Sequence, residues 1–178
     1  MRPIGFHFLD MRPVRVLHER PRSPNIAAAE PRNPARKAAP FVTDQTTRLV
    51  LPSHVEAVAD AAAAVTEFIR NCGASEEAGF GVEMAVREAV TNAVVHGNQE
   101  DEAKSVELIF NCHGNELEVE VRDQGHGFDP EEVPDPTDPA NLLKTSGRGI
   151  FLMRTFMDDI QWLPSPAGGT AVRMTKRF

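Results

Sequence analysis

The sequence predicts a two-layer α/β sandwich of the α+β type, with helices on one face of a mainly antiparallel, mixed sheet. Three observations support this class. Apolar residues recur at helical spacing through 53–73 and 75–97, they alternate with polar residues through 104–123, and turn signals separate these segments. Alternation implies a sheet with one covered face and one wet face, so the helices should cover one face only.

The first predicted elements are a short strand and a helix. The stretch "TDQTTRLVLPS" (43–53) predicts a strand that Pro52 stops. Ser53 stands three residues before Glu56, which is the spacing of a capping box, and we expect the helix that starts there to end at Gly73. Residues at helical spacing predict its core-facing stripe: Val55, Val58, Ala62, Val65 and Ile69.

A second predicted helix begins at Ser75 and stops at Gly97-Asn98. Apolar residues surround much of its girth, so we expect it to be well buried. These residues are Phe80, Met84, Val86, Ala89, Val90, Ala93 and Val94.

One side of this second helix is polar. Glu88, Asn92 and His96 follow one another at intervals of four residues, about one turn apart. A buried glutamate is costly without a partner. Either Glu88 pairs locally, with Arg87 or Arg122, and His96 is a helix-end histidine favoured by the dipole, or this side of the helix serves a functional site.

The rest of the chain supplies the sheet. Alternation in "KSVELIFNCHGNELEVEVRD" (104–123) predicts two strands joined by a turn at "HGNE". A loop rich in Pro, Asp and Gly spans 124–149, a helix follows at 150–157, and "DDIQWL" and "TAVRMTKRF" predict the last two strands. Together these elements predict one domain over 41–178.

Residues 1–40 have a different composition. They carry eight Lys and Arg against three Asp and Glu, a net charge of +5, and hold seven of the fourteen prolines, whereas 41–178 carries −12. Such a segment cannot form a continuous helix and has few apolar groups to offset its ordering entropy. We expect a disordered extension, or residues upstream of a true start at Met11; an Arg-rich targeting or nucleic-acid-binding arm is the alternative.

Composition also excludes several classes of protein. Cys72 and Cys112 are forty residues apart with no further Cys or His nearby in a metal-binding pattern, which argues against a disulfide framework or a zinc site and favours the cytoplasm. The most apolar run, "AVADAAAAV", is too short to cross a membrane. The acidic charge of 41–178 opposes direct binding to nucleic acid.

The segment "VRDQGHGFDP" contains a possible ligand-binding turn. Asp123 closes an alternating strand, and Gly125 and Gly127 follow in a D-x-G-x-G pattern. An aspartate at a strand end can accept a hydrogen bond from an exocyclic amine such as that of adenine, and glycines allow the backbone to approach a flat ring. The same residues are also common in ordinary turns.

Another glycine cluster lies directly before a predicted helix. "TSGRGIFLMR" places Gly147 and Gly149 around Arg148, and backbone amides at a helix N-terminus form an anion site that glycines leave open to phosphate. It is neither a Walker A loop nor a Rossmann fingerprint. Finally, "GGT" before the last strand offers the hydroxyl of Thr170 where the sheet could meet a base.

These four motifs in this order resemble the GHKL superfamily, whose members share the Bergerat ATP-binding fold. "REAVTNAVVHGN" is similar to its N box, "RDQGHGF" to its first glycine box and "SGRGIFLM" to its second. Within the superfamily, "EAVTNAVVHG" and "GRGIFLMRTFMDDI" most resemble the anti-sigma-factor serine/threonine kinases. The likeness covers about residues 43–178.

The resemblance implies a role for each motif. Asn92 would coordinate the Mg²⁺ that bridges the ATP phosphates, as an oxygen ligand suited to a hard cation. Glu88 would take the proton from the serine hydroxyl that attacks ATP. Asp123 would hold the adenine amine, with a water shared by Thr170. The expected nucleotide-binding set also includes His96. Gly125 and Gly127 would line the base, and Gly147, Arg148 and Gly149 would surround phosphate beneath a lid in which Lys144 is a further contact.

The implied function is a Mg·ATP-dependent protein serine/threonine kinase that phosphorylates a STAS-type anti-anti-sigma protein, and also binds a sigma factor. The same Glu-x-x-x-Asn pair occurs in ATPases in which the glutamate activates water, so a hydrolytic ATPase is a minor alternative. The main alternative is an ATP-gated binding module with little or no phosphotransfer. The family also implies a homodimer.

Overall fold

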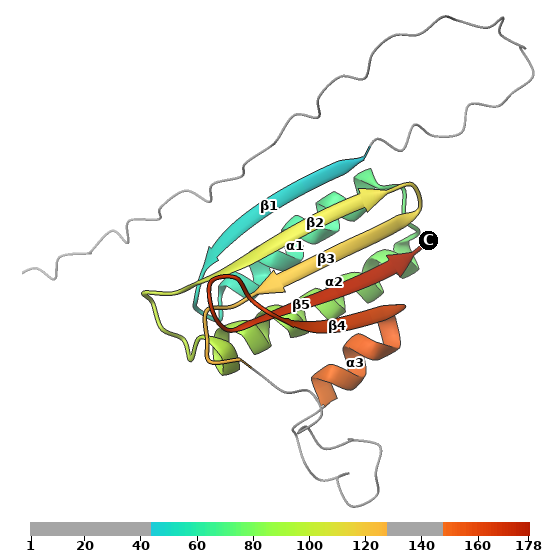
Figure 1. Ribbon diagram of the computed structural model, residues 1–178. Coiled ribbons are helices and arrows are strands. Elements are labelled where there is room, and N and C mark those ends of the chain that lie inside the picture. Colours follow the sequence, from blue (N-terminus) through green and yellow to red (C-terminus); the bar gives the residue numbers. More distant parts are fainter. Residues whose placement is uncertain (1–43, 128–147) are drawn as a thin grey trace, which may run out of the picture.

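The computed structural model describes residues 44–127 and 148–178 (Figure 1). The expectations for segment 1–40, for Gly147 and for Lys144 concern residues outside these ranges. The described elements are, in chain order, β1 (Gln45–Pro52), α1 (Ala57–Asn71), α2 (Glu76–Thr91), η1 (Asn92–Gly97), β2 (Ser105–His113), β3 (Glu116–Arg122), α3 (Arg148–Phe156), β4 (Asp159–Pro164) and β5 (Thr170–Arg177).

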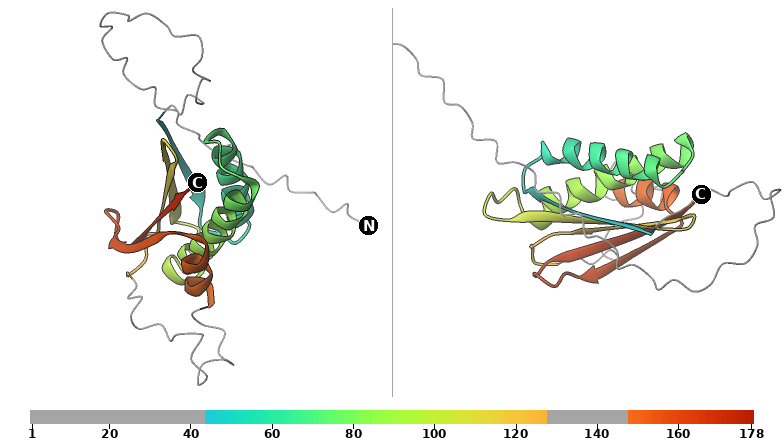
Figure 2. Two further views of the ribbon diagram at one scale, coloured as in Figure 1. Left: turned by 90° about the vertical axis from the view of Figure 1, so that its right-hand side faces the viewer. Right: turned by 90° about the horizontal axis from the view of Figure 1, so that it is seen from above.

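The described strands form one five-stranded sheet in the order β1-β2-β3-β5-β4. The helices lie together on one of its faces (Figure 2), which confirms the predicted two-layer class. All of the pairs between described strands are antiparallel, so no parallel pair appears in this part of the chain. One row of apolar neighbours crosses all five strands beneath the helices: Leu49, Leu108, Val121, Val172 and Trp162.

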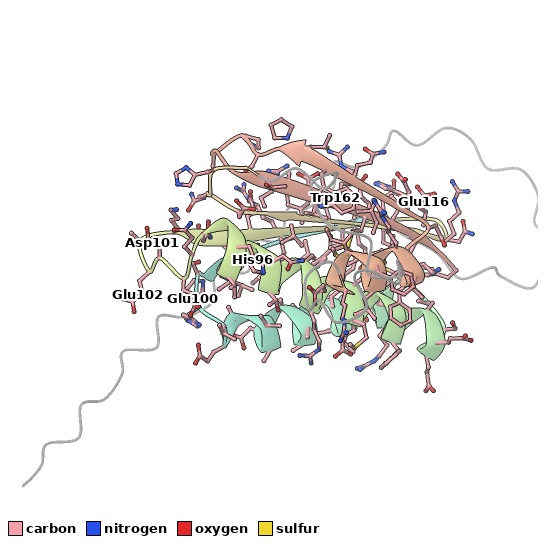
Figure 3. All side chains as sticks on the ribbon, turned by 90° about the horizontal axis from the view of Figure 1, so that it is seen from below. His96, Glu100, Asp101, Glu102, Glu116 and Trp162 are labelled. Carbon is pink, nitrogen blue, oxygen red and sulfur yellow. The ribbon has the colours of Figure 1, made fainter. Side chains whose placement is uncertain are left out.

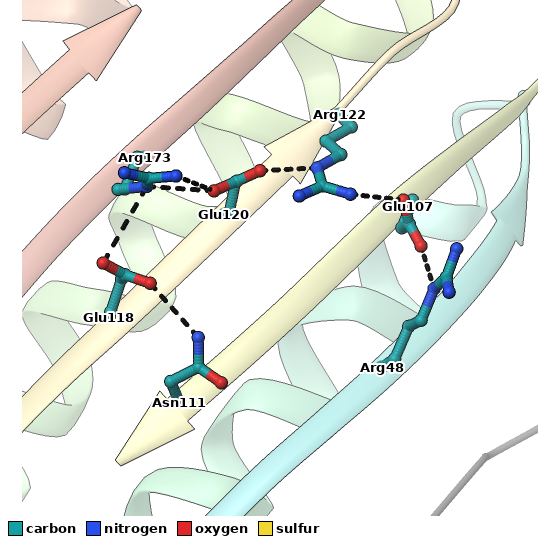
Figure 4. A network of polar contacts seen from close by, with 7 residues as sticks. All are labelled: Arg48, Glu107, Asn111, Glu118, Glu120, Arg122 and Arg173. Atoms are coloured by element: carbon teal, nitrogen blue, oxygen red, sulfur yellow. Dashed lines mark hydrogen bonds and ion pairs between the residues drawn. The ribbon is translucent and has the colours of Figure 1, made fainter. Parts of the chain in front are cut away.

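The opposite face of the sheet carries charged residues that pair across the strands (Figure 4). Glu107 pairs with Arg48 and with Arg122, and Glu120 pairs with Arg122 and with Arg173. Glu120 is only 5% exposed although no described helix covers it. Burial by itself would raise the pKa of Glu120, but hydrogen bonds from Arg122 and Arg173 and their charges together lower it below its usual value.

The start of α1 differs from the capping-box prediction. Ser53 is buried, and its hydroxyl makes no hydrogen bond among the described residues. The helix begins at Ala57, and Glu56 pairs with His54 (Oε2 to Nδ1, 3.2 Å) instead of closing a box. The reason is that the chain leaves β1 through tight turns, in which His54 N donates to Pro52 O and Ala57 N donates to His54 O, each at 3.0 Å.

The same turn moves Val55 out of the predicted core stripe, since it lies before the helix and is 48% exposed. Val65 and Ile69 are buried as expected, and Phe68 joins them and packs on Phe110 with 5.5 Å between ring centroids. The C-terminal prediction is confirmed, because Gly73 follows the helix with φ +79°, the left-handed conformation that ends helices.

The predicted start of the second helix is confirmed, but the helix changes from α to π winding near its end. The Ser75 hydroxyl accepts a hydrogen bond from Ala78 N (3.2 Å), as a helix cap should. Phe80 is 59% exposed, so the prediction that it is buried is wrong; it packs edge-on against Phe156 of α3 instead. From Asn92 the helix widens into the π-helical segment η1, with hydrogen bonds spanning five residues rather than four.

The two cysteines meet inside the core, although forty positions separate them. Cys72 caps the end of α1 and Cys112 lies on β2, and both are buried free thiols. Burial raises the pKa of the Cys72 thiol, and its hydrogen bond with Cys112 raises it further. Elsewhere in the described part, no helix has the length and apolar character needed to cross a membrane.

Candidate functional site

Asp123 lies directly after β3 and is held rigidly by its neighbours. Its Oδ1 accepts hydrogen bonds from the backbone N of Gly125 (2.8 Å) and of Thr170 (3.1 Å), and its own N donates to Thr170 O (2.9 Å). The residue is 6% exposed. Among the described residues, no hydrogen bond ends on Oδ2, so this oxygen can accept one from a ligand.

Glycines from three segments surround this carboxylate. A Cβ on Gly97 would lie 2.5 Å from Asp123 Cγ, and one on Gly169 would lie 2.1 Å from Asp123 Oδ1. A Cβ on Gly125 would lie 2.2 Å from the backbone oxygen of Gly97. Any larger residue at these positions would displace the carboxylate or the backbone beside it. The end of η1, the loop after β3 and the turn before β5 therefore converge on Asp123.

Sequence reasoning missed the role of Gly97 and only partly found that of Gly169. The sequence predicts only that Gly97 ends a helix, and that Gly169 belongs to the "GGT" turn that carries Thr170. No local signal distinguishes a glycine required by a distant carboxylate from a glycine required by a turn. Gly127, by contrast, has φ +93°, and no described atom lies within 4 Å of the place of a Cβ there, so its requirement is conformational.

A second contact joins Glu88 of α2 to the first turn of α3. A Cβ on Gly149 would lie 1.7 Å from Glu88 Oε1, so the carboxylate rests against the Gly149 backbone. Negative charge is favourable at a helix N-terminus. Arg148, with which the described part of α3 begins, is exposed beside this contact. The structure thus brings together two of the predicted motifs, since Glu88 and Gly149 are sixty-one positions apart in the sequence.

Neither local pairing considered for Glu88 is present. Arg87 pairs with Glu83 (Nε to Oε1, 2.9 Å), and Arg122 pairs with residues on the outer face of the sheet. Of the two alternatives for Glu88, local pairing with an arginine is therefore absent among the described residues. The half-buried Glu88 carboxylate remains available to a substrate.

Asn92 and His96 lie where the helix changes form. Asn92 is half-buried, and its backbone N still donates to Glu88 O and Ala89 O, so the step from Glu88 to Asn92 is one α-helical turn. Beyond Asn92 the wider winding means that four residues no longer complete a turn. His96 is exposed at the end of the molecule that also carries Glu100, as Figure 3 shows. The predicted alignment on one side of the helix therefore holds from Glu88 to Asn92 but not from Asn92 to His96.

Comparison with known proteins gives a consistent result. Residues 51–176 match the model of the histidine kinase-like ATPase domain. An anti-sigma F factor of Clostridium botulinum (strain Eklund 17B / Type B) is 36% identical over 121 residues, which are 65% of this chain and 82% of that protein. An anti-sigma F factor of Oceanobacillus iheyensis is 31% identical over 132 residues, 73% of this chain and 90% of that protein.

A serine-protein kinase RsbW, also of Oceanobacillus iheyensis, is 29% identical over 117 residues, 62% of this chain and 74% of that protein. The family match covers well over half of the chain and includes every described element from the end of β1 to β5. The chain therefore belongs to the histidine kinase-like ATPase domain family of the GHKL superfamily, in the group of the anti-sigma-factor serine/threonine kinases.

Proposed function

We propose that this protein is a Mg·ATP-dependent serine/threonine kinase that phosphorylates a STAS-type anti-anti-sigma protein and also binds a sigma factor. One observation carries the proposal: Glu88 lies against the first turn of α3, has no salt bridge among the described residues and stands one helical turn before Asn92. A carboxylate placed in this way can serve as a general base. Membership in a kinase family supports this role.

The nucleotide base would bind at Asp123. Its Oδ1 is occupied by the amides of Gly125 and Thr170, so Oδ2 would accept the hydrogen bond from the exocyclic amine of adenine. The backbones of Gly125 and Gly127 would line the ring, because neither carries a side chain that would cover it. The carboxylate cannot donate a hydrogen bond to a carbonyl group, so we expect adenine to be preferred over purines with a 6-oxo group.

The phosphates would extend toward α3. Backbone amides at the start of this helix, near Arg148 and Gly149, would hold phosphate oxygens with the help of the helix dipole, and Gly147 remains part of this proposal. Among the described residues, no group of three or more His, Cys, Asp or Glu could hold a metal ion. The Asn92 side-chain oxygen would hold Mg²⁺ together with phosphate and water, and the cation would neutralise phosphate charge.

Glu88 would remove the proton from the hydroxyl of the partner's serine. The serine oxygen would form a bond to the γ-phosphorus of ATP, while the bond between that phosphorus and the bridging oxygen breaks and ADP leaves. General base catalysis of this kind contributes about 10²–10⁴-fold in rate. The acidic charge of 41–178 supports a protein partner rather than nucleic acid. A homodimer and a cytoplasmic location belong to the same proposal.

The test is a phosphotransfer assay with purified STAS-domain proteins from the same genome. Wild type, Glu88→Gln and Glu83→Gln are mixed with Mg·ATP and each candidate partner, and the gain of one phosphoryl group is followed by mass spectrometry. Glu83 is the matched control, since it lies on the same helix but pairs with Arg87. We expect Glu88→Gln to bind ATP and lose transfer by at least about 10²-fold, and Glu83→Gln to keep it.

Two outcomes contradict the proposal in different ways. Transfer by Glu88→Gln at the wild-type rate would remove Glu88 from the mechanism. ATP binding by the wild type without modification of any partner would favour the ATP-gated binding module instead.

A further inference from the structure

Asn98 is the first residue after η1, and its side chain is fully buried. Both ends of the amide are used. Nδ2 donates to Ser105 O at the start of β2 (3.0 Å), and Oδ1 accepts from Gln124 N just after β3 (2.8 Å). Gln124 closes a ring, because its Oε1 accepts from Ser105 N (2.8 Å). Asn98 therefore ties the end of the helix to the ends of two strands.

This ring lies directly beside the candidate adenine-binding carboxylate. Gln124 stands between Asp123 and Gly125, so the hydrogen bond from Gln124 N to Asn98 fixes the backbone on both sides of it. Gly97, which precedes Asn98, is the residue whose backbone packs on Asp123 and Gly125. A shift of Asn98 would consequently move both the glycine that supports the carboxylate and the loop that carries it.

We propose that Asn98 is a positioning residue that sets Asp123 for the exocyclic amine of adenine, and thereby determines the preference for adenine over 6-oxo purine nucleotides. This inference rests on the proposed function, because it requires the base to bind at Asp123. A neutral amide suits the position, since it donates to one backbone carbonyl and accepts from another residue's backbone N–H. No other uncharged side chain of this length does so in the same shape.

The selectivity follows from the chemistry of the carboxylate. An ionised carboxylate only accepts hydrogen bonds, so it attracts the amine of adenine and repels the carbonyl oxygen of hypoxanthine. Both effects depend on holding Asp123 Oδ2 at a fixed place. If the ring opens, the Asp123 loop can move, ATP loses its aligned hydrogen bond and ITP loses the repulsion.

The experiment measures the dissociation constants of the full chain for Mg·ATP and Mg·ITP by calorimetry and takes their ratio, Kd(ITP)/Kd(ATP). For Asn98→Ala we expect the ratio to fall about fivefold, mainly through weaker ATP binding. Gln124→Ala removes the acceptor for Ser105 N and leaves both hydrogen bonds of Asn98 in place, so it should shift the ratio in the same direction by a smaller factor; it also serves if Asn98→Ala folds poorly. The matched control is Asn111→Ala, because Asn111 bonds Glu118 on the outer face of the sheet.

A double-mutant cycle separates positioning from general stability. In an Asp123→Asn background, Asn98→Ala should change the ratio by less than about twofold, because the group through which it acts is already altered. Equal weakening of ATP and ITP by Asn98→Ala, or the full fall of the ratio in the Asp123→Asn background, would overturn the inference alone. Failure of the wild type to bind ATP would overturn the proposed function and this inference together.

Discussion

The two ends of the sheet use glycine for different physical reasons. At the hairpin end, Gly114 joins β2 to β3 with φ +63°, and a Cβ there would meet no described atom within 4 Å. At the opposite end, a Cβ on Gly97, Gly125 or Gly169 would overlap a carboxylate or a backbone atom. In Figure 3, the label of Glu116 marks the hairpin end and the label of His96 marks the side of the site. The hairpin glycine is required only for its backbone conformation, whereas three glycines of the site are also required because a side chain there would overlap other atoms.

This difference explains what each end can do. A turn with open space around it tolerates change and carries no information about its neighbours. An end at which three segments touch can hold a charged group in one orientation, because each segment blocks the movement of the next. Substitutions at the two ends should therefore have separable effects on stability and on nucleotide binding.

The largest effect is expected for Gly125→Ala. The new methyl group would lie 2.2 Å from Gly97 O, and a backbone atom cannot move aside without opening the loop. We expect a loss of about 3 kcal/mol in the free energy of unfolding, measured with urea, together with loss of ATP binding. Near wild-type stability with normal binding would show that the end of η1 does not pack on this loop.

Gly149→Ala should act mainly on catalysis. Its methyl group would displace the Glu88 side chain, which can rotate away at little cost in stability. We expect phosphotransfer to fall about 10²-fold, as when a general base is misplaced, while ATP binding stays near normal in a direct titration. A parallel loss of binding and transfer would instead place the damage at the phosphates.

Glu120→Gln tests the strands between the two ends. Glu120 has a lowered pKa in the folded state, so its contribution to stability is complete above the usual carboxyl pKa of 4.5 and is lost as the pH falls toward the lowered value. We expect the variant to lose about 2 kcal/mol at neutral pH, because two charged hydrogen bonds weaken. Urea denaturation at neutral and acid pH should show the difference from the wild type shrinking in acid; a constant difference would contradict the assignment.

Gly114→Ala should have the smallest effect. The left-handed conformation costs a residue with a Cβ about 1 kcal/mol, and none of the described atoms lies close enough to add a steric penalty. Thermal unfolding should show this small loss, and the titration with ATP should be unchanged. A change in ATP affinity would mean that the hairpin end communicates with the site.

Much of the fold could be predicted because its signals are local. Alternation from Ser105 to Arg122 correctly identifies both strands and their buried face. Gly73 correctly marks the end of α1, and the Ser75 cap correctly marks the start of α2. The capping box at Ser53 failed because its spacing describes only the side chains. The turns that follow β1 use the backbone groups in another way.

The site was only partly predictable. Glu88, Asn92 and Asp123 could be identified from motifs. The contact of Glu88 with Gly149, and the packing of Gly97 and Gly169 against Asp123, could not, because they join segments that are far apart in sequence. The widening of the helix at Asn92 has no signal in residue spacing, since five-residue hydrogen bonds depend on what the helix end must contact. The buried Asn98 ring was missed for the same reason.

The two neighbouring free cysteines inside the core offer a way to measure how α1 moves relative to the sheet. Their thiols are shielded from solvent, and the raised pKa of Cys72 keeps it protonated and therefore poorly nucleophilic. An alkylating reagent should consequently modify them only when α1 separates from the sheet. The rate of alkylation would then record how often this layer opens, with no probe added to the protein.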